Sequence, residues 1–388
     1  MKQSYSRGLK WHEKAAEQGD AMGQYGLALM YYHGKGVEKN YPKAVELYKK
    51  AAEQRNAKAL VMLGNMYCFG EGVEQSYSTT RELWEMAAEQ GQPEAQANLG
   101  SMYLRGDGVE QNYSKARVLI EKAVKQGLVD AQYRLGIMYH DGQGVEQSYS
   151  KARELFERTA KQEQQGHGDS EFMLGAMYSD GHGVKQSHFK AREWYEKAVE
   201  KGQASAQSNL AMMYKDGLGG LKQSCSKARE LFTKSAEQGC DFAQVNLGHV
   251  YYYGHGLEPD YSMAAEWYKK AAEQGLVDPQ FDLGMMYYNG QGVEQSYSMA
   301  MGWWEKAAEH GHADAQYNLG VMYAHGRVVE QDDSKAMRWL AQAADQGCRE
   351  AQPRIDEFLA NRKKRSPNSS KGGVVAQAGK PREVEVAN

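Results

Sequence analysis

One motif recurs along the chain at nearly constant intervals, and this periodicity constrains the fold more than any other feature. A Leu-Gly or Leu-Ala pair appears nine times, at steps of 36, 36, 36, 39, 36, 37, 36 and 36 residues. A period of this length is typical of a supersecondary unit that stacks on its own copies. The two longer steps indicate short insertions, within 162–166 and 216–223. The pairs begin at Leu27, Leu63, Leu99, Leu135, Leu174, Leu210, Leu247, Leu283 and Leu319.

Each copy contains two stretches in which apolar residues have helical spacing. In one copy, Ala95, Leu99, Met102 and Tyr103 fall at i, i+4, i+7 and i+8, which is one face of a helix. A second stripe follows within 113–123, and a Gly-x-Gly turn separates the two. We call these the A helix and the B helix. The pattern predicts an all-α chain of stacked helical hairpins.

The glycines of each copy are explained by packing and by turn geometry. A glycine inside a helix costs about 1 kcal/mol in propensity, and close approach of the A and B helices offsets that cost. The turn glycines supply left-handed backbone, and Ser, Asn or Asp then stands at the position that caps the B helix. No strand precedes the Gly-x-Gly turn, which disfavours a nucleotide site. The glycines assigned structural roles are Gly100, Gly136 and Gly284 in A helices, and Gly142, Gly144, Gly290 and Gly292 in turns.

The motifs A-x-A-Q-Y-x-L-G-x-M-Y, G-x-G-V-x-x-x-Y-S-K-A and W-Y-x-K-A-A-E-Q-G resemble those of the Sel1-like repeat (SLR) family, which is related to the tetratricopeptide repeats. The resemblance covers roughly residues 1–360. It implies a right-handed α/α superhelical solenoid of about nine 36-residue hairpins, with A helices on the inner surface. It also implies an adaptor that assembles protein complexes. One branch of the family acts in endoplasmic-reticulum quality control beside a membrane ubiquitin ligase. A secreted bacterial branch carries a disulfide in every repeat, a pattern that this chain lacks.

The register of the motifs predicts four segments. Residues 1–19 form a half repeat that consists of a B helix alone, and residues 20–346 form nine SLR hairpins. Residues 347–361 form a closing helix. Residues 362–388 have too little apolar content to fold and form a disordered basic tail.

The charge balance and the cysteine content exclude several classes of protein. The net charge is −3, and because residues 362–388 contribute 7 − 2 = +5, the rest of the chain carries −8. An acidic body disfavours nucleic-acid binding. Four scattered cysteines are too few for a disulfide framework. With no long apolar run and no signal sequence, we expect a soluble cytoplasmic or nuclear protein, without direct membrane insertion. An endoplasmic-reticulum location would require a truncated N-terminus.

The sequence contains no recognisable catalytic set and no familiar metal-ligand spacing. His310, His312 and His325 lie near one A helix, but surface histidines in turns are much commoner than zinc sites. We therefore expect a protein that is not an enzyme and has no cofactor and no metal. A hydrolase of the secreted bacterial branch is an unfavoured alternative.

The candidate binding surface is the variable face of the A helices, which we expect to bind a protein or an extended peptide. Positions two before the Leu of each pair, and two, five and six after it, point to the inner face of a tetratricopeptide-like hairpin. Aromatic residues concentrate there toward the C-terminus, and protein interfaces favour such residues. The alternative, that the rings only pack between adjacent A helices, stays open. The predicted site residues are Tyr252, Tyr253, Phe281, Tyr288 and Tyr317, with Asn246, Asp282 and Asn318 beside them.

The first helix presents an apolar face with no A helix before it in the sequence. This predicts either that the N-terminus is truncated or that this end docks on a partner or on a second copy, which would be self-association through the exposed N-terminal helix. The overall expectation is a non-enzymatic scaffold that binds a partner on its concave face. The alternative is a quality-control adaptor of the endoplasmic reticulum whose signal peptide is missing.

Overall fold

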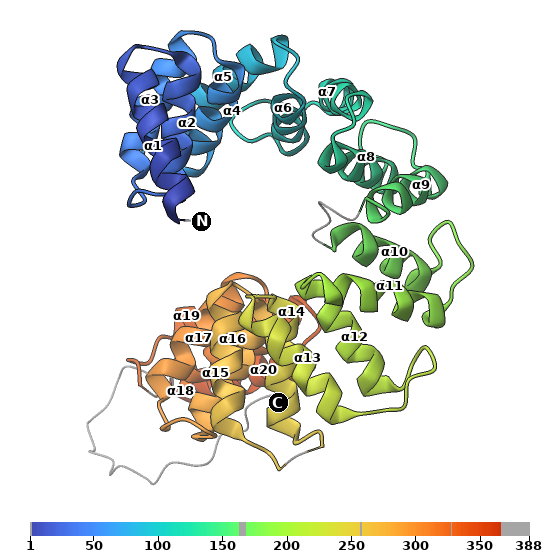
Figure 1. The fold of residues 1–388 in the computed structure, drawn as a ribbon. Coiled ribbons are helices and arrows are strands. Elements are labelled where there is room, and N and C mark those ends of the chain that lie inside the picture. Colours follow the sequence, from blue (N-terminus) through green and yellow to red (C-terminus); the bar gives the residue numbers. More distant parts are fainter. Residues whose placement is uncertain (1, 163–167, 257, 327, 366–388) are drawn as a thin grey trace. The chain divides into compact units, whose positions relative to one another are not determined.

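The structure is a computed structural model that describes residues 2–162, 168–256, 258–326 and 328–365, with side chains described from residue 6 to residue 360. These ranges contain twenty α-helices and no strand, which confirms the expected all-α repeat class. The chain forms two compact units, residues 1–201 with α1–α11 and residues 202–388 with α12–α20. Within each unit the helices follow one another as antiparallel hairpins (Figure 1).

The helices alternate between the two predicted types. The A helices are α2 (Ala21–His33), α4 (Ala57–Phe69), α6 (Pro93–Arg105), α8 (Val129–Asp141), α10 (Asp169–Asp180), α12 (Ala204–Asp216), α14 (Asp241–Tyr253), α16 (Val277–Asn289) and α18 (Ala313–His325). The B helices are α1 (Lys2–Glu17), α3 (Tyr41–Glu53), α5 (Tyr77–Glu89), α7 (Tyr113–Lys125), α9 (Tyr149–Ala160), α11 (His188–Glu200), α13 (Cys225–Glu237), α15 (Tyr261–Glu273), α17 (Tyr297–Glu309) and α19 (Asp333–Asp345).

Side-chain caps fix where the B helices begin. Ahead of every B helix from α3 to α19, an Asn, Ser or Asp side chain accepts a hydrogen bond from the backbone N–H three residues later. Such a cap satisfies one of the free N–H groups of the first turn and contributes about 1 kcal/mol. The caps are Asn40, Ser76, Asn112, Ser148, Ser187, Ser224, Asp260, Ser296 and Asp332.

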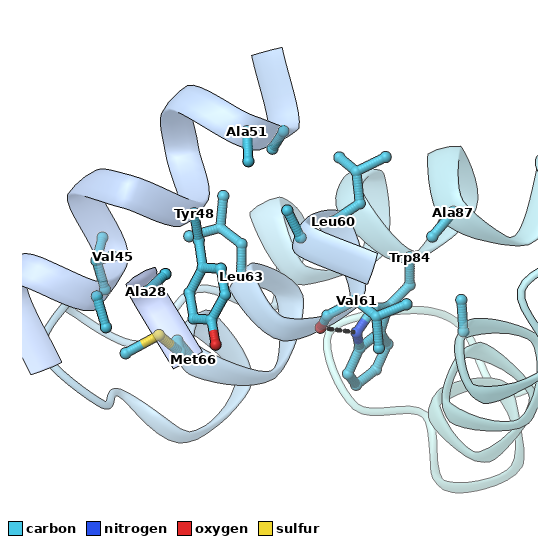
Figure 2. Close-up of a cluster of buried hydrophobic side chains, with 14 of the residues drawn as sticks. Ala28, Val45, Tyr48, Ala51, Leu60, Val61, Leu63, Met66, Trp84 and Ala87 are labelled. Atoms are coloured by element: carbon cyan, nitrogen blue, oxygen red, sulfur yellow. Dashed lines mark hydrogen bonds between the residues drawn. The ribbon is translucent and has the colours of Figure 1, made fainter. Parts of the chain in front are cut away.

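The glycine of each Leu-Gly pair lies against a large side chain of the following B helix. A Cβ placed on Gly284 would lie 2.4 Å from Trp304 Cδ1, and one placed on Gly100 would lie 2.7 Å from Ile120 Cγ1. Figure 2 shows the equivalent indole, Trp84, which lies in the core of unit 1 and donates a hydrogen bond from Nε1 to the carbonyl of Val61 at 3.4 Å. These positions therefore allow the two helices to approach closely at their crossing.

The turns join consecutive repeats within a unit. Gly142 and Gly290 cap their A helices with φ of 72° and 69°. A Cβ on Gly144 would lie 2.6 Å from the Cβ of Tyr113, the first residue of the preceding B helix, and one on Gly292 would lie 2.2 Å from the carbonyl group of Tyr261. Each of these turns thus packs on the beginning of the B helix that precedes it.

Buried glutamines link the ends of the hairpins. The A-helix glutamine accepts a hydrogen bond from a glutamine that follows the B helix of the same hairpin, and several also donate to the last turn of the preceding B helix, as Gln244 does to the carbonyl of Ala236 at 3.2 Å. One hairpin replaces this pair with Lys201 and Glu171, whose Nζ and Oε1 lie 2.5 Å apart. The glutamine pairs are Gln54–Gln24, Gln126–Gln96, Gln238–Gln207, Gln274–Gln244 and Gln346–Gln316.

Among the described residues, two other than glycine adopt the left-handed conformation. Arg55, with φ of 60°, stands where most hairpins have the glycine that closes the B helix, and Val328, with φ of 70°, stands at the second glycine of a turn. A side chain in this region strains the backbone by about 1 kcal/mol or more, most for a β-branched residue. These two positions are therefore local weak points of the array.

The terminal helix differs in range from the expected closing helix. It is α20 (Ala351–Arg365), which begins four residues after the start of the range 347–361 and includes residues 362–365 of the expected tail. Ile355 packs on the last hairpin through a cluster that includes Leu340. The rest of the expected tail, 366–388, lies outside the described residues.

Candidate functional site

Three of the eight predicted site residues are buried. Phe281 and Tyr317 are 7% and 6% exposed, and Asn318 is 1% exposed. The ring of Phe281 stacks on the imidazole of His312 at 4.4 Å between centroids, and Asn318 Nδ2 lies 3.7 Å from the sulfur of Met285. We therefore exclude these three side chains from the surface that a partner can contact directly.

The position two before the Leu packs toward the B helix of its own hairpin, and it is buried in five repeats and half-buried in four. In unit 1, the rings at this position contact the aromatic side chain that lies opposite the Leu-Gly pair, as Tyr133 does with Phe156 at 5.7 Å and Phe172 with Tyr195 at 6.0 Å. At this position, packing within the hairpin thus accounts for Phe281 and Tyr317, whereas the half-buried ring of Tyr133 stays partly accessible.

The position five after the Leu has a different environment. Tyr252 and Tyr288 are half-buried, and their rings lie 5.2 Å and 5.1 Å from Tyr261 and Tyr297, the first residues of the following B helices. The hydroxyl of Tyr252 also donates to Oε1 of Gln291, in the turn of the next repeat, at 3.2 Å. Each of the two rings therefore packs within its own hairpin while one edge remains accessible. Among the ring contacts of the described residues, none joins Tyr252 to Tyr288.

Tyr253 is the most accessible of the predicted residues. Its side chain is 62% exposed, and its ring lies 5.0 Å from Tyr252, 6.0 Å from His249 and 5.9 Å from His255. Asn246, on the same helix, is half-buried and donates to the carbonyl of Phe242 at 2.8 Å. An exposed tyrosine supported by other rings presents a rigid, amphipathic contact surface.

Asp282, on α16, is half-buried. Burial raises the pKa of Tyr252 and Tyr268 most, and the charge of Asp282 raises both further. Burial, and then repulsion from Asp278, raise the pKa of Asp282 itself to about 6. The pKa of His249 is lowered, first by burial and then by Lys215, so this imidazole is neutral at pH 7. Burial therefore opposes the charged form of both side chains.

In unit 1, the same A-helix positions line a groove that the sequence analysis did not name. The groove lies between α6 and α8 and has a volume of about 680 Å³. Its polar groups satisfy one another, since Arg134 Nε lies 2.7 Å from Oδ2 of Asp130 and the same guanidinium donates to Ser101. The repeat positions could have identified this groove, because its lining includes Ser101, Leu104, Arg105, Tyr133, Arg134 and Ile137.

Other kinds of site have less support. Across the described ranges, no three His, Cys, Asp or Glu side chains are grouped so that they could hold a metal ion. The four cysteines, Cys68, Cys225, Cys240 and Cys348, are free thiols. In the part of the chain that the structure describes, no helix is both long enough and apolar enough to cross a bilayer.

Comparison with family models explains the repeated hairpin. The model of the Sel1 repeat matches residues 1–20, 21–56, 57–92, 93–128, 129–163, 168–203, 204–240, 241–276, 280–312 and 313–348. No curated protein matches the chain.

Solved structures with the same repeat are similar over most of the chain. The protective antigen c5321 of uropathogenic Escherichia coli, which displays an SLR fold, is 36% identical over 92% of this chain and 75% of its own, with a TM-score of 0.58. A Sel1 repeat protein of Oxalobacter formigenes is 30% identical over 85% of this chain and 93% of its own, with a TM-score of 0.56. A signal-transduction ATPase of Pyrococcus horikoshii with a tetratricopeptide-repeat sensor shares the fold alone, at 14% identity over 89% of this chain and 54% of its own and a TM-score of 0.50.

Proposed function

Because this chain belongs to the Sel1 repeat family, whose members generally mediate protein–protein interactions on a fold that is generally non-catalytic, we propose that it is a non-enzymatic scaffold that binds an extended peptide segment of a partner along its A helices. The observation that carries the proposal is the groove of about 680 Å³ between α6 and α8. Its walls come from the A-helix positions that vary between repeats, while the positions that build the hairpin keep their residue types. Variable residues on a fixed frame suit selection of a partner.

In unit 2, accessible tyrosines on the A helices support the proposal that a partner binds along these helices. Tyr252, Tyr253 and Tyr288 each present a ring edge or face there, and aromatic side chains contribute much of the binding energy in protein interfaces. An extended peptide would lie across successive A helices and meet one such position in each repeat. No observation on the described residues favours a quality-control adaptor or a hydrolase, so we propose neither.

Site-specific photocrosslinking tests which face binds. A photoreactive residue in place of Leu104, in the groove, should crosslink a partner from a cell extract, whereas one in place of Val118, 48% exposed on α7, should not. The double variant Tyr252→Ala/Tyr288→Ala should keep its helical content and lose captured protein. Equal crosslinking from both positions, or unchanged capture by the double variant, would refute binding along the A helices.

We also propose self-association through α1. Trp11 is 76% exposed, whereas Leu47, Trp267 and Trp303, which occupy the same position in other B helices, are 6% to 8% exposed. Trp11→Ser should therefore lower the apparent mass in light scattering at high protein concentration. A monomeric wild-type chain at the same concentration would contradict the idea.

A further inference from the structure

We propose that His140 and His182 together bind a divalent transition-metal ion of the class that prefers imidazole ligands, such as Zn²⁺, and that this ion joins two consecutive repeats of unit 1. His140 is the penultimate residue of α8, and His182 lies in the turn that follows α10. Neither residue lines the groove between α6 and α8, so the site is independent of the proposed binding of a partner. It follows from the positions of the two imidazoles in the repeat and from the groups that orient them.

In two other repeats, the position that His140 occupies forms a polar link to the next repeat. This position stands five after the Leu, and its side chain reaches the residue between the two glycines in the turn of the next repeat. Tyr32 donates from its hydroxyl to Oε2 of Glu71 at 2.8 Å, and Tyr252 donates to Oε1 of Gln291 at 3.2 Å. The fold therefore brings the polar ends of these two positions within bonding distance of each other.

His140 and His182 occupy the same two positions at the next repeat junction of this kind. His182 lies between Gly181 and Gly183, and it stands 42 residues after His140 rather than 39 because this repeat carries the insertion of three residues. The ring centroids of the two imidazoles are 5.8 Å apart. With zinc–nitrogen bonds of about 2.0–2.1 Å, two imidazoles on one ion have centroids about 5 to 6 Å apart. The observed spacing is therefore compatible with two ligands of a single ion.

Neighbouring side chains orient both rings. Nδ1 of His140 lies 2.6 Å from Oδ1 of Asp141, and because a carboxylate accepts a hydrogen bond, this contact favours the tautomer in which Nε2 is free to bind a metal. The ring of His182 stacks on Tyr149, with centroids 4.9 Å apart and an angle of 10° between the planes. Gln147 donates from Nε2 to the hydroxyl of this tyrosine at 3.1 Å. The two imidazoles are thus held in place without the ion, which favours binding.

The pair supplies two protein ligands, and water supplies the others. The side chain of His140 is 20% exposed and His182 is half-buried, so an ion and its water can reach both rings. Because no group of three ligands occurs among the described residues, we expect weaker binding than in a structural zinc site with four protein ligands. Imidazole nitrogen suits Zn²⁺, Cu²⁺ and Ni²⁺, whereas Mg²⁺ and Ca²⁺ prefer oxygen ligands.

Isothermal titration calorimetry of the untagged full chain with ZnCl₂ tests the site. The main variant is His140→Tyr/His182→Gln, which reproduces the Tyr252–Gln291 pair of unit 2 and so keeps a link at the junction while removing both imidazoles. We expect this variant to bind Zn²⁺ at least about 100-fold more weakly than the wild-type chain, because loss of a group that only orients a ligand already costs about 10- to 100-fold. MgCl₂ in excess should leave Zn²⁺ binding unchanged.

Two single variants test the assignment. Asp141→Asn should weaken Zn²⁺ binding about tenfold, because it removes the carboxylate that orients His140. His310→Ala, at an exposed position in unit 2, is the control and should leave the affinity within about twofold. Equal affinity of the wild-type chain and the double variant would overturn the site. A loss in His310→Ala as large as that in the double variant would show binding to scattered histidines, and would also overturn it.

Amide hydrogen exchange tests whether the ion joins the repeats. Zn²⁺ should slow exchange over residues 181–187 of the wild-type chain at least about threefold, because the bound ion opposes local opening of the turn. The same addition should leave exchange in His140→Tyr/His182→Gln unchanged. Zn²⁺ binding by the wild-type chain without slower exchange in this turn would refute a link between the repeats.

Discussion

The unusual environment of Asp282 makes a quantitative prediction about stability. Burial and Asp278 raise its pKa from 3.8 to about 6 in the folded chain, and unfolding returns it to the ordinary value. The folded state thus binds more protons at Asp282 than the unfolded state between these values, so this side chain's contribution to stability is most favourable below pH 3.8 and is lost as the pH rises through 6. A shift of about 2 units corresponds to about 3 kcal/mol at most.

Asp282→Asn removes the charge while keeping the shape of the side chain, so it should stabilise α16 at neutral pH. The expected gain in unfolding free energy is about 3 kcal/mol at pH 7.5, and it falls to about 1 kcal/mol at pH 4.5, where the folded wild-type chain is already protonated. The measurement is amide hydrogen exchange over residues 277–289 at both pH values, corrected for intrinsic exchange rates. The exposed variant Glu266→Gln is the control and should change little.

A gain that is equal at the two pH values would refute this reasoning, because it would mean that the ionisation of Asp282 does not oppose folding. A loss of stability at pH 7.5 would also refute it. The predicted result would identify Asp282 as a residue whose charge lowers the stability of the free chain, a cost that functional residues often carry.

Three other substitutions test the packing. Arg55→Gly should raise the unfolding free energy by about 1 kcal/mol in a urea titration, because its φ is 60° and glycine relieves the strain; an unchanged midpoint would contradict the strain. Lys201→Gln should destabilise unit 1 by about 2 to 4 kcal/mol, because Glu171, 3% exposed, is left with its charge unpaired, and adding Glu171→Gln should recover most of the loss. Gly284→Ala should destabilise unit 2 by about 1 to 3 kcal/mol in thermal unfolding followed by circular dichroism, whereas Gly302→Ala, where a Cβ would meet nothing within 4 Å, should stabilise it by up to about 1 kcal/mol; the opposite order would refute close packing at the first position.

The sequence predicts the hairpin well because its main signals are local. The caps, the turn glycines and the apolar stripe act over a few residues, and each is repeated, so an error in one copy is corrected by the others. Ser148 and Gly142 illustrate this, since both lie in the structure at the ends of helices that the repeat predicts. The family and the all-α class follow from these signals.

The candidate site is predicted less well because exposure depends on neighbouring helices. Tyr317 and Tyr133 both stand two before the Leu, yet Tyr317 is 6% exposed whereas Tyr133 is half-buried and lines the groove between α6 and α8. The difference arises from what packs beside each ring, which the repeat pattern does not encode. The sequence alone also does not predict the pairing of Lys201 with Glu171. The two residues are 30 positions apart, and the glutamine pairs with the same spacing are seen only in the structure.

The glutamine links have a consequence for how such a chain can change its length. Gln274 and Gln244, like Lys201 and Glu171, lie within one 36-residue copy or its slightly longer variant, so both halves of each bond are inherited together. Duplication of a whole copy therefore duplicates both partners of the hydrogen bond. The Lys201–Glu171 ion pair would likewise stay complete wherever its copy is inserted. Recombination in the middle of a hairpin would instead bring a lysine beside a glutamine, or leave a buried glutamate alone.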